Sequence, residues 1–414
     1  MIDIFSRAAL REGAVLASLN IAEESFPSLK RARGMSADEL VRIVECSGLT
    51  GKGGAGFPTY RKIEFLRRQA PDHRYLVING AEHEPGSLKD RFLLENHAET
   101  VLEGALILAH AAGVREVLLT VNECCVDELA AAKAALDHMA AAGVTESAPP
   151  MVLRIVAVPD SYMVGEESAL LEVLEGRAAL PRKKPPFPVE KGLNGHPTLI
   201  QNVETVAHLP FILAHGTDNY RALGIDGAGV TLCTFGAEFL NSGVRTIPLG
   251  ISIRELIYGY GGGLKSGIEI KAVQPGGPSA GFLTSSQFDT PFLPGTLKEA
   301  GSALGCGAIR AYSQDDDMIP VIAEIAEFFA ENSCGQCPQC RMETQMLSKI
   351  INQTLSGRGN QRLLKQIPVI VRANAGKGIC SLINMPVDPV LSVLKNFGAE
   401  FDRYLVDEGE RKHG

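Results

Sequence analysis

Apolar and polar positions follow two different periods in the first half of the chain. Apolar residues recur at helical spacing in 36–48, 99–114 and 126–143, and short apolar runs occupy 73–82, 115–123 and 152–159. Such runs are typical of buried strands, and strands that alternate with helices form a mostly parallel sheet covered on both faces. Residues 1–46 are predicted to be helical, with Ser36 and Glu39 forming a capping box. The first half is therefore predicted to be an α/β domain.

The pattern changes twice in the second half. Residues 181–205 are rich in proline and glycine, but aromatic and amide residues lie among them, which argues against a flexible linker. Residues 229–283 contain short apolar runs around one helical stretch, so a small mixed β domain is predicted there. From residue 318 onward the apolar spacing is helical again.

Length and charge restrict the class of protein. A chain of 414 residues is long enough for two or three domains. The net charge is −8 and the longest basic run is 182–184, so we expect no nucleic-acid partner. No charge-free apolar run approaches the ~20 residues of a membrane-spanning helix, and no secretory signal is evident. Nine cysteines, an odd number, favour reduced thiols. We therefore expect a cytoplasmic protein without direct membrane insertion.

Three cysteines stand close together near the C-terminus. Cys334, Cys337 and Cys340 form C-x2-C-x2-C, and Cys380 follows forty residues later. Three thiolates at this spacing can hold one side of a cuboidal [4Fe–4S] cluster, which a distant fourth cysteine completes. Zinc sites prefer two spaced pairs, and a redox C-x-x-C needs only two cysteines. The spacing favours the iron–sulfur cluster, with zinc, redox thiols and chance as alternatives.

A glycine-rich loop spans residues 51–56. It reads G-x-G-x-x-G, but a predicted helix precedes it and Phe57 follows, unlike a Rossmann motif, and it lacks the Gly-Lys-Ser/Thr of a P-loop. Its glycines allow the backbone to lie against a planar or phosphorylated ligand, with N–H groups directed at anionic oxygens. Lys52 and Lys62 supply positive charge nearby. A tight turn between helices is the alternative.

Three polar, glycine-punctuated stretches stand at apparent strand ends. They span 78–91, 162–172 and 199–205. In open α/β sheets, ligands bind outside the carboxyl ends of the strands. Together these loops therefore favour a binding site in the first domain.

These segments together resemble one family. In chain order, "GKGGAGFPT", "YLVINGAEHEPGSLKDR", "YMVGEESALLEVLEGR", "KKPPFPVEKGLNGHPT", "QNVET" and "SCGQCPQCR…GIC" resemble the flavin- and NADH-binding subunit of respiratory complex I. That family includes diaphorase subunits of NAD-dependent hydrogenases and formate dehydrogenases. The resemblance covers about residues 40–400. It implies N-terminal helices with a Rossmann-like FMN domain in 1–225, a β-grasp soluble-ligand-binding domain in 226–312, and a C-terminal four-helix bundle carrying a [4Fe–4S] cluster in 313–414.

The resemblance also implies roles for individual residues. FMN would be held by Gly51, Lys52, Gly53, Gly54, Lys62, Asn79, Glu82, Gly165, Ile200, Gln201 and Asn202. The NADH adenine would pack on Phe57, Phe65 and Phe187, and Glu84, Glu166, Glu167 and Lys184 would complete the cofactor site, with Glu84 near the nicotinamide and Tyr162 over the flavin. Cys334, Cys337, Cys340 and Cys380 would hold the cluster. Ala81 stands where the family usually has aspartate, Gln201 replaces asparagine and Lys52 replaces arginine.

The implied function is electron input. Hydride passes from NADH to FMN, or in reverse to NAD+, and single electrons leave through the cluster to an iron–sulfur partner subunit with a thioredoxin-like [2Fe–2S] domain and further redox subunits. No side chain is needed as a general acid or base, and any membrane association is through partners. The alternative is a non-catalytic scaffold or electron relay with cofactor binding lost, which Ala81 motivates. The choice between complex I, hydrogenase, formate dehydrogenase and bifurcating assemblies stays open.

Overall fold

The N-terminal part of the described chain is helical. The computed structural model describes residues 26–70, 73–144 and 151–405, so the predicted helix over 1–25 lies outside the described residues. Two helices follow, α2 (Pro27–Arg33) and α3 (Ala37–Ser47). The Ser36 hydroxyl accepts a hydrogen bond from the Glu39 N–H, and the Glu39 carboxylate accepts one from the Ser36 N–H. The predicted capping box is confirmed.

A four-stranded parallel sheet forms the centre of the first half. Its strands are β1 (Tyr75–Gly80), β2 (Glu116–Asn122), β3 (Val152–Val158) and β4 (Thr198–Asn202), in the order β3-β2-β1-β4. The chain moves outward from β1 to β3 and then returns to place β4 on the other side of β1. The strand order therefore reverses between β1 and β4, where Asn79 and Asn202 are register partners. Ligands of open α/β sheets bind at such a reversal.

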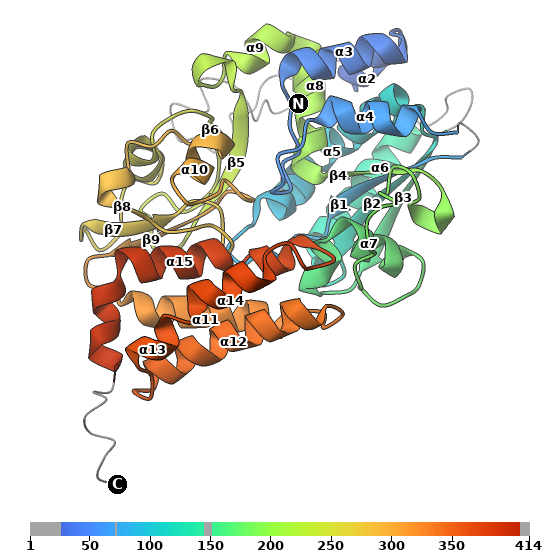
Figure 1. The fold of residues 1–414 in the computed structure, drawn as a ribbon. Helices are drawn as coiled ribbons and strands as arrows, with labels where there is room; N and C mark the ends of the chain where they lie inside the picture. The colour runs from blue at the N-terminus through green and yellow to red at the C-terminus, as the bar shows by residue number, and fades with distance from the viewer. Residues whose placement is uncertain (1–25, 71–72, 145–150, 406–414) are drawn as a thin grey trace, which may run out of the picture.

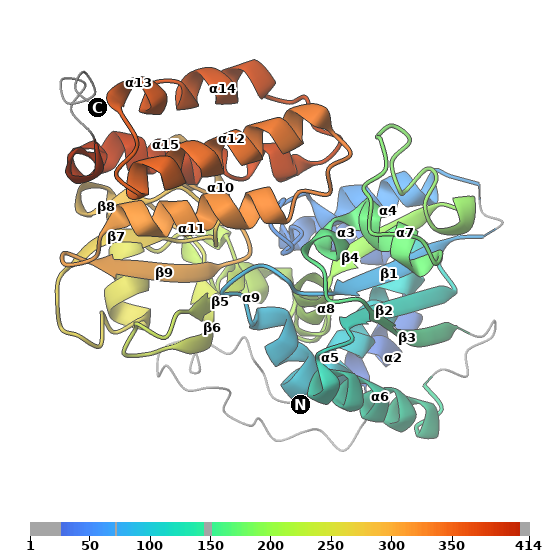
Figure 2. The ribbon, with the colours of Figure 1, turned by 90° about the horizontal axis from the view of Figure 1, so that it is seen from below.

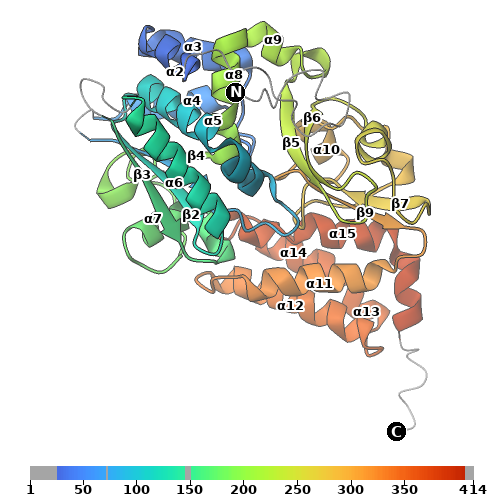
Figure 3. The same ribbon diagram turned by 180° about the vertical axis from the view of Figure 1, so that it is seen from behind.

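Helices cover both faces of this sheet, as Figures 1 and 3 show. They are α4 (Thr59–Arg67), α5 (Lys89–Ala112), α6 (Val126–Ala141), α7 (Glu167–Leu174) and α8 (Val203–His215). Because side chains alternate along a strand, Leu76 and Ile78 pack with α5 and α8, whereas Val77 packs with α7. Helix α5 begins ten residues earlier than predicted, because the charged Lys89 and Asp90 stand at its start, and its backbone is kinked at His97.

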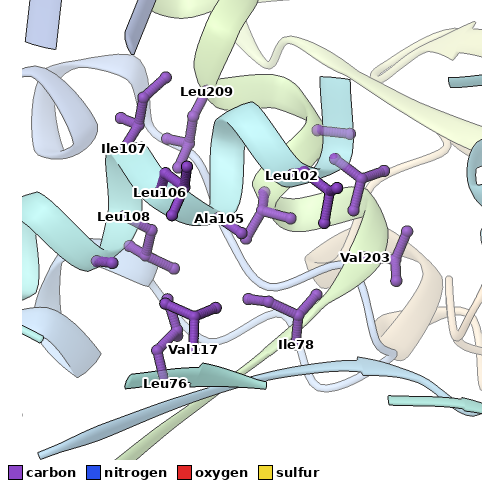
Figure 4. Close-up of a cluster of buried hydrophobic side chains, with 14 of the residues drawn as sticks. Leu76, Ile78, Leu102, Ala105, Leu106, Ile107, Leu108, Val117, Val203 and Leu209 are labelled. Atoms are coloured by element: carbon purple, nitrogen blue, oxygen red, sulfur yellow. The ribbon is translucent and has the colours of Figure 1, made fainter. Parts of the chain in front are cut away.

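The main core lies between the sheet, α5 and α8. Figure 4 shows Leu76, Ile78 and Val117 of the strands facing Leu102, Ala105 and Leu106 of α5, with Val203 and Leu209 of α8. Each large apolar side chain buried here contributes about 1.5–3 kcal/mol. A Cβ on Gly104 would lie 2.0 Å from the Val206 carbonyl oxygen, so the two helices touch through their backbones at that point. Only glycine permits this approach.

A five-stranded mixed sheet follows. It contains β5 (Val230–Phe235), β6 (Gly243–Pro248), β7 (Ile270–Gln274), β8 (Leu283–Thr284) and β9 (Ala308–Ser313), in the order β6-β5-β9-β7-β8. Strands β5 and β9 are parallel, and the other pairs are antiparallel. Helix α9 (Thr217–Arg221) precedes the sheet, and a π-helix (Glu255–Tyr260) and α10 (Pro294–Glu299) pack within this region. The predicted mixed β region is confirmed.

The C-terminal part is helical, as predicted. It contains α11 (Met318–Glu331), α12 (Pro338–Leu355), α13 (Gln361–Leu364), α14 (Ile367–Asn374) and α15 (Val387–Asn396). Figures 1 and 2 show these helices side by side, along one side of both sheets. Their core includes Ile322, Phe329 and Leu347 and extends to Phe282 beside the mixed sheet. Among the described residues, no helix is long and apolar enough to cross a bilayer.

Candidate functional site

The glycine loop forms a narrow hairpin between α3 and α4. The Gly51 N–H donates to the Phe57 carbonyl over 2.8 Å, and the Thr59 N–H donates to the Leu49 carbonyl over 3.1 Å. Gly54 has φ +104, a conformation that side-chain-bearing residues rarely adopt. The loop is therefore closed at its base, and Gly53 and Gly54 at its tip are exposed backbone without side chains.

The loop lies on the first turn of α8. A Cβ on Gly53 would lie 3.3 Å from the Asn202 Cβ, and the Lys52 N–H donates to the Thr205 hydroxyl over 2.9 Å. The Lys52 side chain is buried, and its ammonium donates to the Val230 carbonyl of β5 over 2.9 Å. Burial lowers the pKa of this ammonium. Lys52 thus uses both its backbone N–H and its ammonium inside the protein.

Amide side chains gather where the strand order reverses. Asn79 is the second-last residue of β1. Its amide donates to the Gly165 carbonyl over 3.2 Å, and its oxygen accepts from the Ala81 N–H over 3.0 Å. Gln201 of β4 is buried beside Gly51, and its Nε2 has no partner among the described residues. Buried amide donors are rarely left unpaired. The geometry therefore fits a ligand that offers Gln201 an acceptor atom.

Glu82 lies just after β1 and caps α5. Its Oε2 accepts from the backbone N–H groups of Asp90 and Arg91, each over 3.1 Å, and its Oε1 accepts from the Ser87 hydroxyl. A carboxylate at a helix N-terminus satisfies unpaired N–H groups and interacts favourably with the helix dipole. Burial, with the nearby Asp90 carboxylate, raises the pKa of Glu82 to about 7. Glu82 therefore fixes the start of α5 at this edge of the sheet.

A charged cluster joins α4, α7 and the proline-rich segment. The Lys184 ammonium lies 2.9 Å from Glu166 and 2.8 Å from Glu167. The Lys62 ammonium lies 3.4 Å from Glu167 and donates to the Ile200 carbonyl over 3.3 Å. Burial alone would raise the pKa of Glu167, but the two lysines hold it below its usual value. The structure thus brings four predicted site residues together and links them to β4.

Three aromatic side chains predicted to contact the adenine are exposed. The rings of Phe57 and Phe65 lie 6.4 Å apart and tilted, and these side chains are 38% and 39% exposed. Phe187 is 50% exposed and makes no ring contact with either of them. The structure therefore brings two of the three aromatic residues together, and the Arg68 guanidinium lies over the Phe65 ring, 5.7 Å from its centroid.

Glu84 and Tyr162 connect this edge of the sheet to the C-terminal helices. The Tyr162 hydroxyl donates to Glu84 Oε2 over 2.9 Å, and Glu84 Oε1 has no partner among the described residues. Burial raises the pKa of Glu84 to about 7, against the opposing effect of the tyrosine hydrogen bond. The Tyr162 ring packs edge-on against Phe328 of α11, with centroids 4.9 Å apart. The pair therefore stands between the sheet edge and the cysteine-rich region.

The four predicted cysteine ligands line one pocket, together with Met163 and Pro181 of the first half. Cys337 precedes the first residue of α12, and Cys380 precedes the 3-10 helix Ser381–Asn384. Helix N-termini favour negatively charged sulfur. The Ile379 N–H donates to the Cys337 sulfur over 3.2 Å. The pocket has the donors and the ligands that a thiolate-bound cluster needs.

The arrangement of these thiols also bears on the kind of metal group. Within 26–70, 73–144 and 151–405, no three Cys, His, Asp or Glu side chains are grouped to hold a single metal ion. In a cubane each thiolate binds its own iron, so the four sulfurs surround the cluster rather than one point. The four cysteines line one pocket, as the ligands of such a cluster must.

Sequence reasoning missed several residues at these sites. Met163 and Pro181 line the cysteine pocket, and Lys89, Asp90 and Glu204 form a buried charge cluster behind Asn202. The sequence gives one local sign of this charge cluster: Glu204 begins the apolar run of α8, where a buried charge needs a partner of opposite sign. That partner, Lys89, is 115 positions away, so the sequence pattern does not identify it.

Comparisons with known families cover both sites. Residues 44–210 match the Nuo51 FMN-binding domain family, and residues 320–404 match the NADH-ubiquinone oxidoreductase-F iron-sulfur binding region. The glycine loop and the strand reversal lie in the first match, and the four cysteines lie in the second. The fold and the two sites therefore define a flavin-binding domain combined with an iron–sulfur domain.

Whole-chain relatives identify the family. The F-type subunit of the NADH-quinone oxidoreductase of Streptomyces coelicolor is 33% identical over 93% of this chain and 87% of its own length. Its counterpart in Escherichia coli K12 is 34% identical over 90% of this chain and 86% of its own. The chain belongs to this family of NADH-quinone oxidoreductase F-type subunits. The structure also superposes on a chain of an NAD+-reducing [NiFe]-hydrogenase in the H2-reduced state, with a TM-score of 0.86 and 29% identity. The alignment covers 94% of this chain and 66% of the hydrogenase chain.

Proposed function

We propose that the chain is the flavoprotein electron-input subunit of a larger redox complex, oxidising NADH or reducing NAD+. One observation carries this proposal: the loop after β1, at the strand reversal, is connected to the four-cysteine pocket through adjacent residues, Tyr162 bonded to Glu84 and Met163 in the pocket wall. When bound, FMN supplies the hydride chemistry and a [4Fe–4S] cluster supplies one-electron transfer onward. The work of the protein is to hold the two groups near each other.

The flavin site is proposed at the reversal of strand order. The residues assigned to it are Gly51, Lys52, Gly53, Gly54, Lys62, Asn79, Glu82, Gly165, Ile200, Gln201 and Asn202. The open glycine backbone and the unpaired Gln201 amide support direct contact with a planar, hydrogen-bonding ligand. Lys52 and Glu82 support the site from behind, because Lys52 bonds the Val230 carbonyl and Glu82 caps α5.

The dinucleotide site is proposed beside it. Phe57, Phe65 and Phe187 offer exposed rings to the adenine, since aromatic faces stack on purines. Glu166, Glu167 and Lys184 line the pocket, and the carboxylates accept ribose hydroxyls and repel the extra phosphate of NADPH. Glu84 and Tyr162 stand at the nicotinamide and flavin end, toward the cysteine pocket. Hydride goes directly to the flavin, so no general acid or base is assigned.

Three domains are proposed, with boundaries at 225/226 and 312/313. The hydrophobic clusters support this division: one spans residues 26–232, one 233–311 and one mainly 318–401. We assign the first to a Rossmann-like FMN domain, the second to a β-grasp fold, and the third to a four-helix bundle of α11, α12, α14 and α15. Strand β5 contributes to the first two clusters, which links the domains tightly.

The proposed electron acceptor is an iron–sulfur subunit with a thioredoxin-like [2Fe–2S] domain, within an assembly of further redox subunits. The relatives are named as parts of an NADH-quinone oxidoreductase and an NAD+-reducing hydrogenase, which supports an assembly of this kind. Any contact with a membrane is proposed to be through those partners.

The rival scaffold function depends on Ala81. This residue is buried in an apolar cluster with Val77 and Leu170, so the position offers no polar group to a flavin. The unpaired Gln201 amide and the exposed Phe57 and Phe65 favour retained cofactor binding. The test is to purify the chain anaerobically with its partner and record its absorption with NADH and with NADPH. Flavin bleaching by NADH alone supports the proposal, and iron–sulfur absorption without flavin supports the scaffold.

A further inference from the structure

A fully buried lysine begins helix α5. Lys89 is 1% exposed, and its ammonium lies 2.7 Å from Asp90 Oδ1, 3.2 Å from Glu204 Oε2 and 3.2 Å from Asn202 Oδ1. Burial alone would lower the pKa of this ammonium, but Asp90 and Glu204 raise it, so Lys89 stays charged. Buried charges are retained only where partners of opposite sign surround them. Lys89 therefore joins the starts of α5 and α8.

The same network reaches the mixed sheet. Glu204 Oε1 accepts from the Thr231 hydroxyl over 2.9 Å and from the Leu232 N–H over 2.7 Å. The neighbouring Val230 carbonyl accepts from the Lys52 ammonium over 2.9 Å. Burial would raise the pKa of Glu204, but Lys89 beside it lowers this pKa to about 2, so the carboxylate is charged. Three successive residues of β5 are thus fixed to the back of the glycine loop and α8.

On its other side the network supports the glycine loop. The Asn202 side-chain oxygen accepts from Lys89 and from the Glu204 N–H over 2.9 Å, and its amide donates to Asp90. The amide donates one of its two hydrogens to Asp90, so the second can bond another acceptor. Asn202 also lies against Gly53, where an added Cβ would be 3.3 Å from the Asn202 Cβ. The position of the loop and the orientation of this amide both depend on the network.

We propose that Lys89 is a positioning residue of the flavin site. It acts through Asn202: by pairing with Asp90 and Glu204 between two helix starts, it holds the Asn202 amide and the first turn of α8 against the glycine loop. This inference rests on the proposed function, since it assigns that loop to the flavin. A lysine with only a general structural role would support the fold without affecting the affinity of folded protein for FMN.

The test uses the full chain with its iron–sulfur cluster reconstituted. Lys89→Met removes the cation, and the double variant Lys89→Met/Asp90→Asn removes one charge of each sign and keeps an acceptor for the Asn202 amide. Lys133→Met, at an exposed position of α6, is the matched control. Quenching of flavin fluorescence gives the dissociation constant for FMN, and the visible absorption shows whether the cluster is present. The melting temperature of the flavin-free protein measures stability.

The double variant is expected to keep its cluster absorption and to bind FMN at least tenfold more weakly than the unmodified chain, and Lys133→Met to stay within twofold. FMN affinity within twofold of the unmodified chain in the folded double variant overturns the inference. So does a double variant that loses both its fold and its cluster absorption, because Lys89 then supports the whole chain. Failure of the unmodified chain to bind FMN contradicts the proposed function itself, a separate result.

Discussion

The phenol of Tyr162 donates a hydrogen bond to the Glu84 carboxylate over 2.9 Å, joining the loop after β1 to the short helical turn after β3. The tyrosine ring also packs on Phe328 of α11, and its neighbour Met163 lines the cysteine pocket. The contact therefore links the proposed nicotinamide end of the site to the wall of the proposed cluster pocket.

Tyr162→Phe is expected to destabilise the protein. It leaves the buried Glu84 carboxyl without its hydrogen bond, a loss of about 1–2 kcal/mol in the free energy of unfolding. Denaturant unfolding measures this loss, and Tyr258→Phe, at a 42% exposed position, is the control. Equal unfolding free energies for Tyr162→Phe and Tyr258→Phe would show that the Tyr162–Glu84 hydrogen bond does not stabilise the protein.

Glu84→Gln is expected to change how stability depends on pH. Burial raises the pKa of Glu84 from its usual 4.5 to about 7 in the folded protein, so the folded state binds this proton more tightly than the unfolded state. The associated stability is complete below about pH 4.5 and is lost as the pH rises through 7. The unmodified protein should therefore lose about 1–3 kcal/mol relative to Glu84→Gln between pH 5 and 8. Melting temperatures across this range provide the check, and parallel curves for the two proteins would disprove the raised pKa.

Cys337→Ser is expected to separate the two cofactors. Its sulfur lines the four-cysteine pocket and accepts the Ile379 N–H, so its loss should remove the visible iron–sulfur absorption while FMN remains bound. Cys124→Ser, at an exposed thiol outside the pocket, should retain both signals. Loss of flavin together with the cluster would show that the two domains do not fold independently.

Phe65→Ala is expected to weaken NADH binding with little effect on stability. The side chain is 39% exposed, so the unfolding free energy should change by no more than about 0.5 kcal/mol. Loss of an aromatic contact of about 0.5–1.5 kcal/mol should raise the KM for NADH about two- to tenfold. Leu240→Ala, at a 59% exposed apolar position, is the control. An unchanged KM for NADH would show that Phe65 does not contact the adenine.

Local features of the fold could be predicted because their causes lie within a few residues. The Ser36 capping box and strands β1 to β3 follow from local pattern, and all appear at the predicted positions. The cysteine pocket was also predictable, since three of its four cysteines lie within seven residues. The start of α5 was misplaced because its first turns carry Lys89 and Asp90, whose burial depends on tertiary contacts.

The supporting contacts of the site could not be predicted for the same reason. Lys52 was expected to place a positive charge beside a ligand. In the structure its ammonium is buried and donates to the carbonyl of Val230, 178 positions away. Lys89 and Glu204 meet only because the starts of α5 and α8 are brought together at the edge of the sheet. Periodicity shows which face of a helix is buried, but it does not reveal which distant charge will be buried beside it.

The most direct test of the central claim is an anaerobic NADH titration of the chain with and without FMN, followed by the electron paramagnetic resonance signal of the reduced cluster. NADH is predicted to reduce the cluster only when FMN is bound, because hydride must be converted to single electrons before it can reach the four cysteines. Reduction of the cluster in flavin-free protein, or a reduced flavin beside a cluster that stays oxidised, would contradict the account.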